Sequence, residues 1–262
     1  MTTPNEIRKE ILEMGLRSKA AHLGSALSLV DILYTLYYKV ANISKDNLDA
    51  PDRDKIILSK GHGSAALYSV LHQKGIISDE AILKYSINDG MLPCHIDMTT
   101  AKGLEASAGS LGHGIGIGVG MALANKMDKR QGNIYVIIGD GEAQEGSVWE
   151  AAEVASTLGL SNLTVIVDFN EIQASGFTNK VVDERNLSER FKAFGFEAAD
   201  VDGHDIDAME KALKNQSAKP KAIIAHTVKG KGVSFMEGTL QSHYVKLNDE
   251  LFEKAMSDLK GI

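Results

Sequence analysis

Short runs of β-branched residues alternate with helical stretches from residue 133 to residue 226, and this alternation constrains the fold more than any other feature. The pattern predicts strands over residues 133–138, 163–168, 196–198 and 221–226, with helices over 145–158 and 206–213 between them. Strands that alternate with helices form a parallel sheet whose two faces are both covered. We therefore expect an α/β fold with a central, mainly parallel sheet and helices on both faces.

The first part of the chain is predicted to be helical. Apolar residues recur at helical spacing over residues 5–17, and further helices are expected from residue 28 through 36 and over 67–74. The 262 residues contain no internal repeat, low-complexity tract or long linker. This length lies near the upper end of one domain, so we expect a single domain over residues 1–262.

Charge and hydropathy exclude several classes of protein. A net charge of -7, without a stripe of Lys and Arg, argues against a nucleic-acid partner. The longest apolar runs, such as residues 135–138 and 163–167, are too short to span a bilayer, so no membrane association is expected. The one cysteine, Cys94, excludes an intramolecular disulfide and is typical of a reducing compartment. Because no apolar signal core follows the start of the chain, we expect a cytoplasmic protein.

Two polar motifs follow two of the predicted strands. Gly139-Asp140-Gly141 closes the first strand, and Asn170 closes the next. Because parallel strands end at the same edge of a sheet, Asp140 and Asn170 are expected side by side. Aspartate and asparagine oxygens suit magnesium or calcium, and the flanking glycines allow a diphosphate to approach the backbone. Gly-Asp-Gly alone also fits an ordinary turn, but the pair of motifs predicts a metal–diphosphate site.

The pair of motifs resembles the thiamine-diphosphate fingerprint of transketolases. The resemblance implies the diphosphate-binding (PP-type) thiamine fold, with Asp140, Asn170 and the backbone carbonyl of Ile172 as ligands of Mg²⁺. Ca²⁺ or Mn²⁺ would be alternatives. Gly141 and the region of Asn170 would also contact the diphosphate.

Further segments resemble transketolase positions in the same order along the chain. The resemblance assigns substrate hydroxyls and proton relay to four histidines, which are His22, His62, His95 and His243. It places His62 and His243 beside the cofactor as well, together with the loop formed by Gly109, Ser110, Leu111 and Gly112. An isolated histidine is usually a surface or hydrogen-bonding residue, and we expect this of His72, His204 and His226.

Three other features have ordinary explanations. Cys94 precedes His95, but adjacent side chains seldom point at one another, so we expect an inert thiol. Residues 228–232, with two lysines and two glycines, resemble a structural turn. The alternating glycines of residues 112–120 predict a helix start that packs closely against cofactor or sheet.

The resemblance covers essentially the whole chain but only the diphosphate-binding third of a transketolase. It implies that the pyrimidine-binding and C-terminal domains, with the glutamate that activates the cofactor, belong to a partner subunit. Glu145 would reach across the interface to that partner, although an acid at a helix N-terminus has the same appearance. Two copies of each chain would give an α2β2 heterotetramer, active only when assembled.

The expected reaction is the transfer of a two-carbon glycolaldehyde unit from a ketose or ketose phosphate to an aldose or aldose phosphate. The substrates can be those of the pentose-phosphate pathway or unusual sulfonated or branched sugars. Two alternatives stay open: the α-subunit of a 2-oxoacid dehydrogenase, and a non-catalytic interaction subunit with a thiamine fold. The early His22 segment and the Gly-His-Gly turn favour transketolase over the first alternative.

Overall fold

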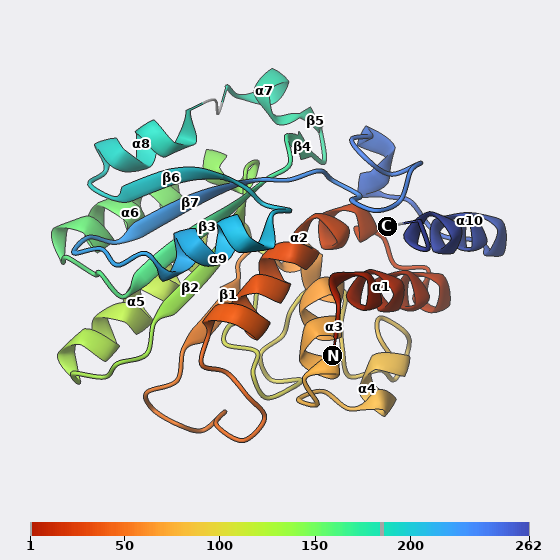
Figure 1. Ribbon diagram of the computed structural model, residues 1–262, viewed down its shortest axis with the longest axis horizontal. Helices are drawn as coiled ribbons and strands as arrows, with labels where there is room; N and C mark the ends of the chain where they lie inside the picture. Colours follow the sequence, from red (N-terminus) through yellow and green to blue (C-terminus); the bar gives the residue numbers. More distant parts are fainter. Residues whose placement is uncertain (1, 184–185, 262) are drawn as a thin grey trace.

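Five parallel strands form the central sheet, in the order β1-β2-β3-β7-β6 (Figure 1). The computed structural model describes residues 2–183 and 186–261. The strands are β1 (Lys55–Leu58), β2 (Ile134–Gly139), β3 (Leu163–Phe169), β7 (Lys221–His226) and β6 (Glu197–Asp202). The predicted parallel α/β sheet is therefore confirmed, and the carboxyl ends of all five strands lie at one edge.

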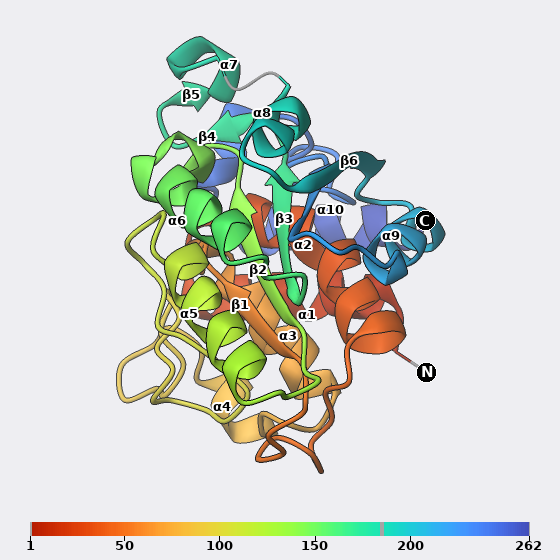
Figure 2. The ribbon, with the colours of Figure 1, turned by 90° about the vertical axis from the view of Figure 1, so that its left-hand side faces the viewer.

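Helices cover both faces of this sheet. One face carries α5 (Gly114–Met127), α6 (Gly146–Thr157) and α8 (Leu187–Ala193). The other carries α2 (Leu23–Thr35) and α9 (Ile206–Lys214), and outside them α1 (Pro4–Ser18) and α3 (Ser64–Gln73) pack on α2. Figure 2 shows the strands between α5 and α6 on one side and α2 and α9 on the other.

The side chains of β2 explain why the strand is apolar at nearly every position. All six of its residues are buried. Ile134, Val136 and Ile138 belong to the hydrophobic cluster that includes α5, whereas Tyr135 and Ile137 belong to the cluster that includes α2. Successive side chains point to opposite faces, so a strand covered on both faces needs apolar residues throughout.

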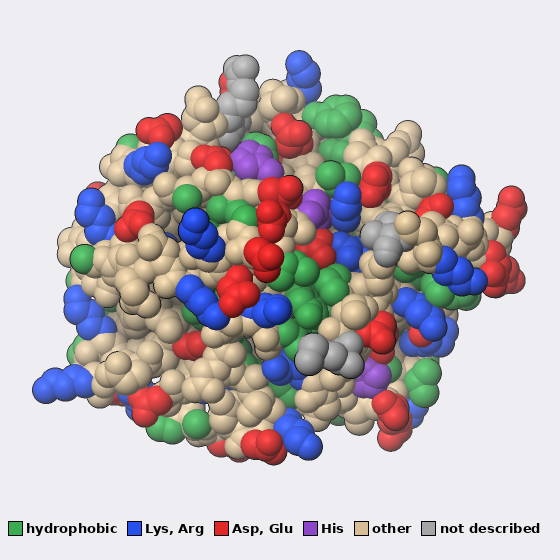
Figure 3. Space-filling model, viewed as in Figure 1, with side chains coloured by type: hydrophobic (Ala, Val, Ile, Leu, Met, Phe, Trp, Pro, Cys, Tyr) green, Lys and Arg blue, Asp and Glu red, His purple; other side chains and the backbone are tan. Residues whose placement is uncertain are grey.

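Shorter elements complete the fold. They are α4 (Asp79–Leu83), the hairpin of β4 (Ile172–Gln173) and β5 (Gly176–Phe177), α7 (Thr178–Val181), α10 (Asp249–Leu259), three 3₁₀ turns (Gly61–Gly63, Glu142–Gln144 and Leu240–His243) and a π turn (Leu36–Val40). None of the helices in the described ranges is long and apolar enough to cross a membrane. Acidic and basic side chains are interspersed on the face shown in Figure 3.

Several boundaries differ from the sequence predictions. The strand over 221–226 is confirmed, but β6 continues to residue 202, beyond the predicted 196–198. The helix predicted from residue 28 begins at Leu23, directly after His22, which has a left-handed φ of 69° and makes no side-chain cap. A start without a capping hydrogen bond leaves little signal in the sequence. Strand β1 and helix α10 were not predicted.

Candidate active site

The segments that follow β1, β2, β3 and β7 surround a pocket of about 400 Å³ at the carboxyl edge of the sheet. This is the usual position of ligand sites in open parallel sheets. The pocket is lined by nearly all of the residues that the sequence predicted for the site: His22, His62, His95, Gly109, Leu111, Asp140, Gly141, Glu145, Asn170, Ile172 and His243. Ser110 is exposed and is not one of the lining residues.

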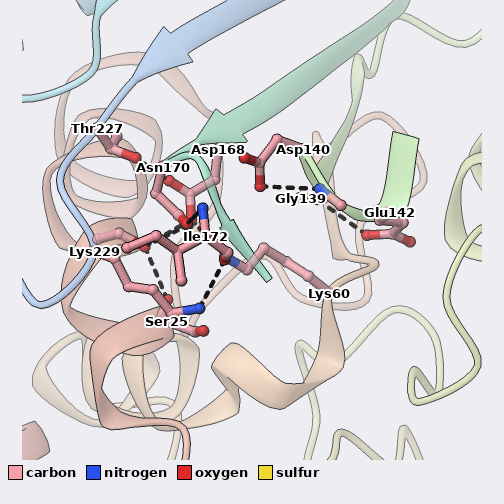
Figure 4. Close-up of polar contacts among 12 residues, drawn as sticks. Ser25, Lys60, Gly139, Asp140, Glu142, Asp168, Asn170, Ile172, Thr227 and Lys229 are labelled. Atoms are coloured by element: carbon pink, nitrogen blue, oxygen red, sulfur yellow. Dashed lines mark hydrogen bonds and ion pairs between the residues drawn. The ribbon is translucent and has the colours of Figure 1, made fainter. Parts of the chain in front are cut away.

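Asp140 and Asn170 lie at the ends of neighbouring strands, as expected (Figure 4). Both are buried, with 2% and 6% of their surfaces exposed. Asp140 Oδ1 accepts a hydrogen bond from Gly141 N at 2.9 Å, and Oδ2 accepts one from Thr178 Oγ1 at 2.9 Å. Burial, followed by repulsion from Asp168, raises the pKa of Asp140. A cation beside this carboxylate would offset both the loss of solvation and the repulsion from Asp168.

Hydrogen bonds hold the Asn170 amide in one orientation. Its Nδ2 donates to Asp168 Oδ2 at 3.1 Å, and its Oδ1 accepts from Ile172 N at 3.2 Å. The carbonyl oxygen of Ile172 accepts a hydrogen bond from Lys229 Nζ at 2.8 Å. One carboxylate, one amide oxygen and one carbonyl form a set of hard oxygen donors, which fits a magnesium-like ion that also binds phosphate oxygens and water.

Within the described ranges, no group of three or more His, Cys, Asp or Glu side chains is placed to hold a metal ion. Gly141 fits the prediction of a diphosphate site. A Cβ at this position would lie 2.6 Å from Gln173 Oε1 and would reduce the space in the pocket.

Two buried lysines in the pocket were not predicted from the sequence. Lys60 forms an ion pair with Asp168, and Lys229 lies beside His243; each is 1% exposed. Burial, followed by repulsion from Lys60, lowers the pKa of Lys229 to about 7. The expectation of a purely structural turn at residues 228–232 therefore overlooked a cationic group in the pocket.

Three imidazoles gather around that of His22. Its ring centroid lies 5.0 Å from that of His243, 5.5 Å from that of His62 and 5.7 Å from that of His95. Burial, then the charge of His95, lowers the pKa of His22, and burial, then Lys60, holds the pKa of His62 well below its usual range. Burial, then Lys229, lowers the pKa of His243 to about 3. These three rings are therefore neutral at neutral pH and can both donate and accept hydrogen bonds.

Two polar atoms at the pocket wall have no hydrogen-bond partner in the part of the chain that the structure describes. They are His22 Nδ1 and Ser25 Oγ, which are both buried. A buried polar atom without a partner is costly. Their positions suit a ligand that carries hydroxyl or other polar groups.

Three histidines outside the pocket, and Cys94, have partners of their own. His72 contacts Glu10 and Asp79, His204 contacts Asp31, and His226 contacts Asp200, so the expected hydrogen-bonding roles are confirmed. The expectation that Cys94 and His95 would point apart is wrong. Cys94 Sγ lies 3.3 Å from His95 Nδ1, because the irregular segment between α4 and α5 turns both side chains to the same side.

Glu145 stands at the rim of the pocket. It is exposed, and it occupies the position before the first residue of α6 without making a side-chain cap. An exposed acid at this place is compatible with an interface contact and with the favourable field at a helix N-terminus.

Comparison with known proteins identifies the family. Residues 4–259 match the model of the transketolase thiamine diphosphate binding domain. The chain is 40% identical to the 6-deoxy-6-sulfo-D-fructose transketolase subunit SqwG of Clostridium sp., over 98% of this chain and 94% of that protein. It is 38% identical to one subunit of the apulose-4-phosphate transketolase of Actinobacillus succinogenes, over 97% of this chain and 93% of that protein.

A solved structure agrees with these matches. The crystal structure of transketolase from Campylobacter jejuni superimposes with a TM-score of 0.92 at 34% identity and covers 98% of this chain. The chain spans only 42% of the Campylobacter protein, whereas it spans nearly all of the two subunits. The chain belongs to the transketolase family of thiamine-diphosphate-binding transferases.

Proposed function

We propose that this chain is the diphosphate-binding subunit of a two-chain transketolase, which transfers a two-carbon unit from a ketose phosphate or related ketose to an aldose. One observation carries the proposal. The oxygen donors of Asp140, Asn170 and Ile172 line the same cavity as the imidazole of His22 and the three imidazoles around it. A cofactor anchored at the first group would present its reactive end toward hydroxyl-binding side chains at the second.

The anchoring end would work through charge and hard oxygen ligands. Asp140, Asn170 and the Ile172 carbonyl would hold a divalent cation, with Mg²⁺ as the first choice and Ca²⁺ or Mn²⁺ as alternatives. Lys60 and Lys229 add positive charge at the same wall, which favours a diphosphate. Thiamine diphosphate, when bound, supplies the electron sink for breaking the bond next to the ketose carbonyl.

The imidazoles would bind and orient the sugar. Lys229 Nζ lies 2.8 Å from His243 Nδ1. A bound diphosphate would favour the protonated form of Lys229, which can only donate, so Nδ1 would then accept and Nε2 would carry the proton. His243 can therefore donate from Nε2 to a hydroxyl or carbonyl oxygen. His22, His62 and His95 would hold the neighbouring hydroxyls and exchange protons with them.

The lengths of the relatives support a partner chain. The two relatives that this chain matches over almost their whole length are named as subunits, and the Campylobacter chain is more than twice as long. We propose that residues 1–262 form one domain and that a second chain supplies the pyrimidine-binding domain, its activating glutamate and the C-terminal domain. Exposed Glu145 would contact that chain at the pocket rim, in an α2β2 assembly.

Reconstitution tests the proposal. The chain is co-expressed with the product of the neighbouring gene, and two-carbon transfer is assayed with Mg²⁺ and thiamine diphosphate for each chain and for the pair. The donors include a pentose phosphate, a 6-sulfonated ketose and a branched ketose phosphate, because the two subunit relatives are named for sugars of the last two kinds. Activity in the pair alone is expected. Oxidative decarboxylation of a 2-oxoacid by the pair, without two-carbon transfer, would contradict the proposal.

A further inference from the structure

Glu142 is a buried carboxylate that the proposed chemistry does not use. It lies two residues after Asp140, in the 3₁₀ turn that follows β2, and only 2% of its surface is exposed. A carboxylate at such a depth needs hydrogen-bond donors. Glu142 has three, and each comes from a different segment of the chain.

The three donors belong to three walls of the pocket. Oε1 accepts from Gly112 N at 2.8 Å and from the hydroxyl of Ser59, and Oε2 accepts from Gly139 N at 3.1 Å (Figure 4 shows the last of these). Ser59 precedes the pocket residues Lys60 and His62. Gly112 follows the pocket residues Gly109 and Leu111, and Gly139 itself lines the pocket beside Asp140 and Gly141.

The same carboxylate organises the start of α5. That helix has no side-chain cap from its own N-cap residue, His113. Instead, Gly114 N donates to Ser59 Oγ at 3.1 Å, while Ser59 donates to Glu142. Unsatisfied N–H groups at a helix start need such acceptors, and a negative charge is favourable there.

Close packing limits how far these three segments can move relative to one another. A Cβ on Gly114 would lie 2.4 Å from Ser59 Oγ, and a Cβ on Gly112, whose φ is +81°, would lie 2.4 Å from Ser147 Oγ. Ser147 Oγ also donates to Gly112 O at 3.0 Å, so the backbone of Gly112 is held on both sides. Close contacts therefore join these segments around the Glu142 carboxylate.

We propose that Glu142 is a positioning residue that sets the separation of three pocket walls, which are the turn after β1, the loop before α5 and the turn after β2. Each of its oxygens accepts a hydrogen bond from the protein, so it would act through the segments that it holds. The inference rests on the proposed function and deepens it, because these walls would receive the cofactor.

The test measures cofactor affinity directly. Mg·thiamine diphosphate is titrated by calorimetry into the full chain, alone and with its partner subunit, for the wild type and for Glu142→Gln. The variant keeps the shape but places an NH₂ group against a backbone N–H. We expect the dissociation constant to rise about 10- to 100-fold, as is typical when a residue that hydrogen-bonds to metal ligands is replaced. The KM for sugar in the cofactor-saturated complex should stay near the wild-type value.

Two further variants keep the result interpretable. Glu253→Gln removes an exposed carboxylate on α10 and should leave the dissociation constant unchanged. Ser59→Ala retains Glu142 but removes one of its donors, and it should raise the dissociation constant by a smaller factor even if Glu142→Gln fails to fold. A role limited to global stability would lower the melting temperature and the fraction of binding-competent protein, without changing the dissociation constant.

The outcomes separate the two proposals. If the wild type and Glu142→Gln bind Mg·thiamine diphosphate with the same dissociation constant, the positioning role is overturned and the proposed function stands. If Glu142→Gln does not fold, an unchanged dissociation constant in Ser59→Ala has the same meaning. A wild-type complex that does not bind Mg·thiamine diphosphate contradicts the proposed function, and the positioning role falls with it.

Discussion

Lys229 Nζ lies 2.8 Å from Nδ1 of His243 and also 2.8 Å from the carbonyl oxygen of Ile172. One buried lysine side chain therefore joins the proposed metal end of the pocket to the cluster of imidazoles. Its charge, after burial, is the next largest cause of the low pKa of His243.

Replacing Lys229 should change both ends of the pocket. In Lys229→Met, the pKa of His243 should rise toward its usual range, because the neighbouring cation is removed. The affinity for Mg·thiamine diphosphate should fall by about tenfold or more, as expected when a charged hydrogen-bond donor is lost. Histidine NMR titration and calorimetry measure the two effects. An unchanged pKa of His243 would show that Lys229 does not lower it.

Stability should decrease as pH rises through the titration of His72. Burial lowers the pKa of His72, but hydrogen bonds to Asp79 and Glu10 outweigh it and raise the pKa above 6.5 overall. A raised histidine pKa stabilises the fold fully below 6.5, and this contribution is lost as pH rises through the folded pKa. Asp79 is exposed, so the change should be about 0.5 kcal/mol or less. Urea unfolding between about pH 6 and pH 8 should show it in the wild type, and His72→Gln should flatten the profile.

A second network, whose residues do not line the pocket, should matter more for stability. Arg8 and His204 both contact the carboxylate of Asp31, and His204 Nε2 accepts a hydrogen bond from Val228 N at 2.8 Å. Arg8 and Asp31 are each 5% exposed. Asp31→Asn leaves the Arg8 charge uncompensated and should cost about 3–5 kcal/mol in the free energy of unfolding.

The matched control for that network is an exposed ion pair. Lys9 Nζ and Glu13 Oε1 lie 4.0 Å apart on the surface of α1, and Lys9→Gln should cost less than about 1 kcal/mol. Chemical denaturation measures both variants. Equal losses in the free energy of unfolding of the two variants would mean that burial does not increase the contribution of the Arg8–Asp31 pair to stability.

Two glycines of α5 should respond to alanine with opposite signs. A Cβ on Gly118 would lie 2.3 Å from Val136 Cγ2, so Gly118→Ala should destabilise the chain by about 1–3 kcal/mol. A Cβ on Gly116 meets nothing within 4 Å in the described structure, so Gly116→Ala should stabilise it by about 0.5–1 kcal/mol. Thermal unfolding of both variants tests this. A loss of stability in Gly116→Ala would contradict the prediction, because it would mean that a Cβ at this position meets other atoms.

The sequence predicted those parts of the fold whose patterns are local. The strands over 133–138 and 163–168 are short, largely apolar runs, and their succession along the chain was sufficient to place Asp140 beside Asn170. Strand β1 has only four residues and follows a stretch of charged residues, so no periodicity marks it. Its absence from the prediction also hid the reason that His62 reaches the pocket.

The lysines and Glu142 show what sequence patterns cannot supply. A lysine in a glycine-rich turn is ordinarily expected in solvent, yet Lys60 and Lys229 are buried because Asp168, Ile172 and His243 come to them from other segments. Glu142 was not predicted for the same reason. Its three donors are distant in sequence or belong to the backbone, so only the assembled sheet reveals its role.

Calorimetric titration of wild type and Asp140→Asn tests whether this chain anchors Mg·thiamine diphosphate through Asp140. Because burial and Asp168 raise the pKa of Asp140, removing its charge should leave the melting temperature of the free chain unchanged or higher. We expect one magnesium-dependent cofactor site for each copy of this chain in the wild-type complex, and its loss in the variant. Equal binding by both proteins, or binding that does not require a divalent cation, would contradict it.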